Sequence, residues 1–100
     1  MQSAAQPNQY TIVNNKRGFS FELSVADAGT VSLTYRWLKG DMLLMQTTVP
    51  PAMQNTPAPD ALIAYVLQHA AAHGLRIRVY CPLVGRYMQQ HPDYNGLLAQ

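Results

Sequence analysis

The sequence contains few charged residues and almost no cysteine. Asp, Glu, Lys and Arg make up 12% of its 100 residues, whereas a typical soluble domain carries about 25%. With a hydrophobic fraction of 48%, this scarcity excludes an intrinsically disordered segment, which is rich in charge and poor in apolar residues. The single cysteine, Cys81, cannot form a disulfide within the chain. A secreted disulfide scaffold is therefore excluded, and a reducing, cytoplasmic location is favoured.

The chain also lacks a basic cluster and a long apolar run. Its net charge is +2, and no cation lies between Lys39 and Arg76, so nucleic acid is not an expected partner. The least charged stretch, residues 42–75, has Asp60 as its only charge and is interrupted by prolines, whereas a membrane helix needs about 20 apolar residues in a row. Residues 1–9 are polar and lack the order of a signal peptide. We expect a flexible segment at residues 1–9 and one domain at residues 10–100.

Alternating apolar and polar residues predict three consecutive strands, at residues 19–25, 30–38 and 42–49. Short turns join them, which is typical of an antiparallel meander. The apolar face of the second strand consists of Val31, Leu33, Tyr35 and Trp37. We expect this face to lie in the core or against a partner. A further edge strand over residues 10–13 is left open.

The second half of the chain predicts two helices around one more strand. Asp60 is the predicted N-cap of the first helix, which should end at Gly74. Residues 76–81 alternate again and predict a strand. Pro82 suits the first turn of a second helix that runs to Gln90, and a last turn follows at residues 94–99. The order β-β-β-α-β-α predicts an α+β domain with one mixed sheet.

Short segments in a fixed order resemble one known family. They are Phe19-Ser20-Phe21-Glu22-Leu23, Leu33-Thr34-Tyr35-Arg36, Thr48-Val49-Pro50-Pro51-Ala52-Met53, Gly74-Leu75-Arg76-Ile77, Cys81-Pro82-Leu83-Val84 and Tyr87-Met88-Gln89-Gln90-His91-Pro92-Asp93-Tyr94. The set resembles the small, single-domain branch of the GNAT superfamily of N-acetyltransferases. The likeness spans Val13 to Leu98.

The resemblance implies an acetyl-CoA site between two strands that part, those predicted at residues 42–49 and 76–81. The pyrophosphate would rest on the loop before the first helix, where free amides favour an anion. The cofactor-binding residues implied in this way are Val49, Gln54, Asn55, Thr56, Ala58, Asp60 and Ala61. The acceptor would be an amine on a small molecule or a protein, and no metal is implied.

The resemblance also implies two catalytic residues. Cys81 would lie near the acetyl thioester, between a strand end and a helix start, where reactive thiols occur. Tyr87 would protonate the departing thiolate. Each residue has a purely structural alternative, because Cys81 suits a small buried hydrophobe and Tyr87 suits an amphipathic packing position.

The loop before the first helix departs from the family pattern, Gln/Arg-x-x-Gly-x-Gly/Ala. It reads Gln54-Asn55-Thr56-Pro57-Ala58-Pro59. Both small positions are proline, which has no N–H to donate to phosphate, and Asp60 adds a negative charge. In the third strand, Gln46 and Thr48 stand where close relatives tend to have histidine and glutamate. The side chains that could deprotonate an amine are therefore missing.

Two functions stay open on these residues. The chain is either an acetyl-CoA-dependent N-acetyltransferase or a non-catalytic GNAT-fold module that binds a ligand or a protein. His69 and His73 lie four apart on a helix, but a zinc site would need a third ligand. Arg76, Arg78 and Tyr80 alternate along one strand face and are predicted to be solvated. A homodimer through the uncharged third strand is left open.

Overall fold

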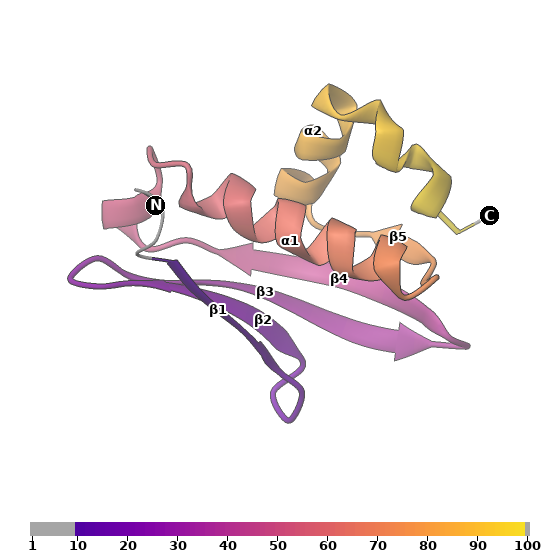
Figure 1. Cartoon of the computed structure of the whole chain (residues 1–100), viewed down its shortest axis with the longest axis horizontal. Coiled ribbons are helices and arrows are strands. Elements are labelled where there is room, and N and C mark those ends of the chain that lie inside the picture. Colours follow the sequence, from indigo (N-terminus) through magenta and orange to yellow (C-terminus); the bar gives the residue numbers. More distant parts are fainter. Residues whose placement is uncertain (1–9, 100) are drawn as a thin grey trace.

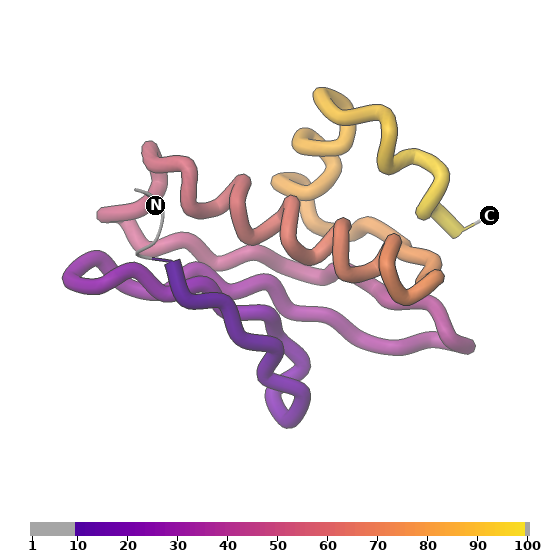
Figure 2. Tube along the Cα trace, viewed as in Figure 1, coloured from indigo at the N-terminus to yellow at the C-terminus, as the bar shows by residue number. Residues whose placement is uncertain are grey.

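A computed structural model describes residues 10–99, and the segment 1–9 predicted to be flexible lies outside them. A five-stranded sheet forms the lower layer of the molecule in Figure 1, and two helices lie above it. Helix α1 (Ala58–Ala72) packs on β2 and β3, while α2 (Pro82–Gln90) packs beside α1 against β4 and β5. Figure 2 traces the chain from the sheet through α1 to the C-terminal turns.

The sheet is mixed, and its strand order is β1-β2-β3-β4-β5. The strands are β1 (Tyr10–Asn15), β2 (Ser20–Val25), β3 (Gly29–Leu38), β4 (Asp41–Thr48) and β5 (Ile77–Val79). The first four are antiparallel to their neighbours, and β5 is parallel to β4. The predicted α+β architecture is confirmed. The edge strand left open at residues 10–13 is formed and is longer than expected.

One apolar core joins the sheet to both helices. Alternate residues of β2 and β3 face it, and Phe21, Leu23, Val31 and Leu33 are fully buried. The helices contribute from their inner faces, for example with Leu67 and Val84. Burying such a side chain contributes about 1.5–3 kcal/mol, which explains why the alternation in the sequence predicts the strands.

Trp37 belongs to the predicted apolar face of β3 but does not lie in the core with Val31, Leu33 and Tyr35. Val31, Leu33 and Tyr35 are 0–2% exposed, whereas Trp37 is 47% exposed. Trp37 lies beside His73 and Leu75, where α1 ends. The helix therefore no longer covers the strand at this point.

The start of α1 differs from the prediction. Asp60 is not the N-cap; Pro57 occupies that position, and Asp60 lies in the first turn. The Thr56 hydroxyl accepts a hydrogen bond from the Ala58 N–H at 3.3 Å and donates one to the Met53 carbonyl at 2.8 Å. Because Thr56 supplies the cap from a residue further back, the helix begins earlier than Asp60 indicates.

The last strand is shorter than the predicted range of residues 76–81. It pairs with only three residues of β4, Met42 to Leu44. Its other edge is bridged by the C-terminal segment, where the Ala99 N–H donates to the Ile77 carbonyl at 2.8 Å. Between β5 and this segment lie α2, which begins at Pro82, and the 3-10 helix η3 (Pro92–Leu97), which replaces the turn predicted at residues 94–99.

Candidate functional site

The strands β4 and β5 part halfway along β4. Their pairing is bounded by two hydrogen bonds, from Met42 N–H to the Arg76 carbonyl and from Tyr80 N–H to the Leu44 carbonyl, at 2.8 and 2.9 Å. The register with β3 shifts at the same place, so that Met45 has no opposing residue. A bulge of this kind bends its strand. Beyond it, β4 pairs with β3 alone, and a gap opens on its other side.

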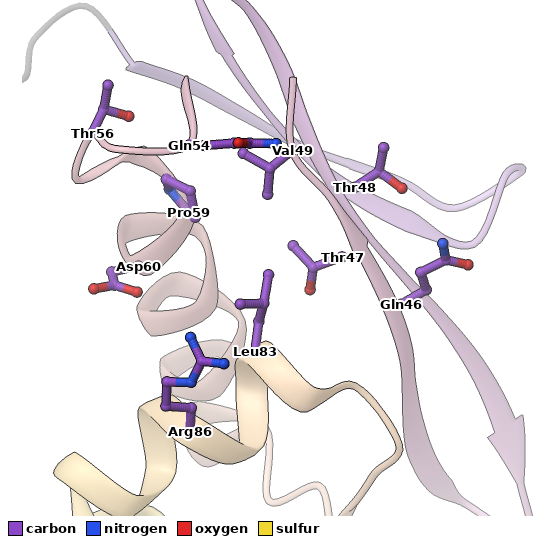
Figure 3. A pocket seen from close by; sticks show the side chains of 10 residues that line it. All are labelled: Gln46, Thr47, Thr48, Val49, Gln54, Thr56, Pro59, Asp60, Leu83 and Arg86. Carbon is purple, nitrogen blue, oxygen red and sulfur yellow. The ribbon is translucent and has the colours of Figure 1, made fainter. Parts of the chain in front are cut away.

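A cavity of about 620 Å³ occupies this gap. It is bounded by the end of β4, the loop after it, the start of α1 and one face of α2 (Figure 3). Its lining residues are Gln46, Thr47, Thr48, Val49, Gln54, Thr56, Pro59, Asp60, Leu83 and Arg86. The cavity is large enough for a small ligand or one arm of a longer one.

Four of the predicted cofactor-binding residues line this cavity: Val49, Gln54, Thr56 and Asp60. The other three do not line it. Asn55 is exposed, Ala58 is buried and Ala61 is half-buried. Gln46 and Thr48, the two positions of β4 singled out in the sequence, both line the cavity.

Cys81 lies behind the cavity wall, at the N-cap position of α2. Its thiol is 3% exposed and lies 3.0 Å from the Thr47 hydroxyl, so that the two groups share a hydrogen bond. Thr47 lines the cavity and stands between the thiol and the open space. The role predicted for Cys81 stays a prediction, and the structure places the thiol one side chain away from the cavity.

Tyr87 lies on α2 but is not among the residues that line the cavity. Its ring stacks on His91 with centroids 4.0 Å apart, and Tyr94 lies at 6.4 Å. Burial raises the pKa of its phenol, and Tyr94 and the Asp60 carboxylate raise it further. The phenol therefore keeps its proton at neutral pH, which a proton donor requires. Its predicted catalytic role stays a prediction.

Arg86, like Thr47 and Leu83, lines the cavity but was not among the predicted site residues. It is the only cation in the described lining, and in Figure 3 its guanidinium extends toward the space between α1 and β4. Arg86 lies on α2, outside the loop before α1 that was expected to hold the pyrophosphate. Leu83 and Arg86 are three residues apart on the predicted second helix, so they share a face, and this spacing is the signal that could have revealed Arg86.

Most backbone N–H groups at the start of α1 already donate hydrogen bonds within the protein or are replaced by proline. Ala58 N–H is bonded to Thr56, Pro59 has no N–H, and Ala61 N–H donates to the Pro57 carbonyl at 3.0 Å. Within the described residues, Asp60 N–H is the first-turn amide that neither a loop carbonyl nor a side chain engages. The helix start therefore offers an anion far fewer donors than a glycine-rich loop would.

The remaining candidate clusters do not form a second chemical centre. Arg78 donates to the Asp41 carboxylate at 3.1 Å, so the predicted stripe with Arg76 and Tyr80 includes an ion pair. In residues 10–99, no three His, Cys, Asp or Glu side chains come together as a metal site would require. No helix of the described region has both the length and the apolar character needed to cross a membrane.

Comparison with known families agrees with the geometry. A family model described as GCN5-related N-acetyl-transferase matches residues 20–97, which include both parting strands and both helices. No curated protein matched the sequence. Because the family model covers most of the chain, the chain belongs to the GCN5-related N-acetyltransferase family.

Proposed function

We propose that this protein transfers an acetyl group from acetyl-CoA to an amine of a small molecule or a protein. The observation that carries the proposal is the cavity at the point where β4 and β5 part. It combines an unpaired strand edge, a polar wall and one cation, in a chain of the GCN5-related family. The single cysteine supports a cytoplasmic location for this activity.

The residues of the cavity fit the cofactor in part. Beyond Leu44, β4 has no β5 residue opposite it, so its backbone groups on that side can bond to the amides of an extended ligand arm. Arg86 supplies a fork of N–H donors for phosphate oxygens. When bound, acetyl-CoA supplies the activated acetyl group as a thioester.

The side chains also limit how an amine loses its proton. Among residues 10–99, the lining contains no histidine or glutamate, and its carboxylate, Asp60, stands at the start of α1 rather than on β4. We infer that the acceptor amine enters already neutral. The rate should then rise about tenfold per pH unit until the pH reaches the pKa of the amine, which is about 10.4 for a lysine side chain.

The first experiment measures acetyl-CoA binding and thiol release with an amine acceptor, for Arg86→Gln and for the unmodified protein. A hydrogen bond to a charged group is worth about 1.5–3 kcal/mol, so the variant should bind acetyl-CoA roughly 10- to 150-fold more weakly. Arg76→Gln is the matched control, because it removes an exposed arginine that does not line the cavity. If both variants bind acetyl-CoA with equal affinity, Arg86 does not contribute to the site. If the unmodified protein does not bind acetyl-CoA, the proposal is rejected.

A second candidate function is supported by the start of α1. Because Pro59 and the Thr56 cap leave few amides there, the module would retain the fold and bind a ligand or a protein without tight CoA binding. Thermal unfolding with CoA separates the two. Ligand at about ten times its Kd adds about 1.4 kcal/mol, or roughly 5–10 °C in Tm. No shift at millimolar CoA favours the second candidate, and a shift created by Pro57→Gly with Pro59→Gly would identify the prolines as the cause.

A further inference from the structure

A second cavity, of about 380 Å³, lies at the opposite end of α1. Its walls include Asn14, Lys16, Tyr35, Trp37, His69 and His73. Asp60 lines the first cavity and His73 lines this one, and 13 helical residues at 1.5 Å each place them about 20 Å apart. The two cavities share no lining residue, so this one does not belong to the proposed acetyl-CoA site.

Aromatic rings form the walls of this cavity. The Trp37 ring meets the Tyr35 ring edge to face, with centroids 5.8 Å apart. The Tyr35 ring is itself held by Phe21 at 5.2 Å. Tyr35 is 2% exposed and Trp37 is 47% exposed. The wall is therefore fixed in the core at one end and open at the other, which leaves indole surface for the ring of a ligand.

Polar groups in the cavity are held in place by hydrogen bonds. The Tyr35 hydroxyl donates to the Asn14 side-chain oxygen at 2.8 Å, which turns the amide nitrogen of Asn14 into the remaining side-chain donor. His73 Nδ1 lies 2.8 Å from the His69 carbonyl, and the two imidazole rings lie 4.2 Å apart. This combination of fixed polar groups with aromatic walls is typical of a small-molecule site.

The lysine and histidine side chains of this cavity are either neutral or positively charged. Lys16 and the two histidines line the cavity, and no Asp or Glu does so within residues 10–99. Burial lowers the pKa of His69, and the positive charges of His73 and Lys16 lower it further. A cleft lined by one sign of charge attracts the opposite sign and repels its own.

We propose that this cavity binds a small aromatic carboxylate, with its ring against Trp37 and its carboxylate facing Lys16, His73 and the Asn14 amide. The aromatic walls favour a ligand with an aromatic ring, and the lysine and histidines favour a ligand with a negative charge. The site goes beyond the proposed acetyl transfer and needs no CoA. The cavity volume suits one or two fused rings with a short acidic arm.

The single tryptophan makes the proposal directly testable, because the chain has one indole and it belongs to a residue that lines this cavity. The probe is phenylacetate, titrated to about 10 mM while the indole resonance is followed by NMR without CoA. We expect a saturable shift with a Kd of about 1 mM or tighter for a ligand of this size. Cyclohexylacetate, which lacks the aromatic ring, should bind more weakly, and phenethylamine, which reverses the charge, should not bind.

Two variants test the positive charge with the ring intact. Lys16→Gln should weaken phenylacetate binding about two- to fivefold, as expected for one partly solvated ion pair. Arg17→Gln removes the same charge one residue away from a side chain that does not line the cavity, and it should leave the affinity unchanged. The proposal is overturned by the absence of a saturable shift, by equal binding of phenethylamine, or by equal effects of the two variants.

Discussion

The two ends of α1 present contrasting surfaces on one helix. At its start the wall is made of threonine, glutamine and proline, and a carboxylate stands near a single arginine. At its end the wall is made of tyrosine, tryptophan and histidine, and its charged groups have one sign. The course of the backbone shapes the first end, because β4 separates from β5 there and Thr56 caps the helix. Side chains from segments that are distant in the sequence shape the second end. One cavity thus forms where two strands separate, and the other forms where aromatic rings pack together. We expect mutations at the two cavities to change the stability of the protein by different amounts.

The largest expected effect is at the aromatic end. Phe21→Ala removes a fully buried ring that contacts Tyr35, Tyr65 and His69 at 5.2–6.1 Å between centroids. Such a change costs about 3–5 kcal/mol of unfolding free energy, a large share of the stability of a small domain. Chemical denaturation measures the loss. Phe19→Ala is the matched control, because Phe19 is 39% exposed, and a similar cost for both variants would contradict the view that this end is held by its buried ring.

A smaller effect is expected at the start of α1. Thr56→Ala removes the hydrogen bonds to the Ala58 N–H and the Met53 carbonyl, and loss of a cap costs about 1 kcal/mol. The Tm should fall by roughly 4–8 °C in calorimetry. Thr48→Ala truncates an exposed threonine on the same cavity and should change the Tm little. If Thr56→Ala were as stable as the unmodified protein, the Thr56 cap would not stabilise the start of α1.

The smallest effect is a pH dependence that only the aromatic end should show. The pKa of His69 is lowered first by burial and then by His73 and Lys16, so the unfolded chain binds a proton more readily than the folded one. Stability is then fully present above about pH 6.5, the ordinary histidine value, and declines as the pH falls through the lower folded pKa. Chemical denaturation between about pH 7.5 and 5.5 measures this decline. His69→Gln should flatten the profile, whereas His91→Gln, at the end of α2, should leave its slope unchanged.

Much of the fold could be predicted from local patterns, because a half-buried strand imposes alternation on its own residues. The buried apolar positions of β2 and most of those of β3 follow from period-two spacing, whereas buried Ser20 does not. The start of α1 could not be predicted in the same way. Asp60 and Thr56 are both good caps by residue type, and only the hydrogen bond from Ala58 shows which one caps the helix.

The sites were less accessible to sequence reasoning than the fold. Four of the seven implied cofactor residues line the first cavity because they are contiguous with β4 and α1. Arg86 was missed because its closeness to the loop arises from packing of α2 beside α1. The second cavity draws Asn14, Trp37 and His73 from three separate elements, and no spacing in the sequence links them.

The short pairing of β5 affects how the first cavity can admit a large ligand. Three residues of β4 pair with β5 and a single bridge to Leu98 supports its other edge, while the antiparallel pairing of β1 to β4 extends along the whole meander. The gap can therefore widen by local opening of β5 without unfolding the rest of the sheet. The Tyr80 amide, bonded to the Leu44 carbonyl at the point of parting, should exchange its hydrogen faster than the amides of β2. We therefore expect β5 to be the movable wall of this cavity, and the exchange of the Tyr80 amide would report its opening.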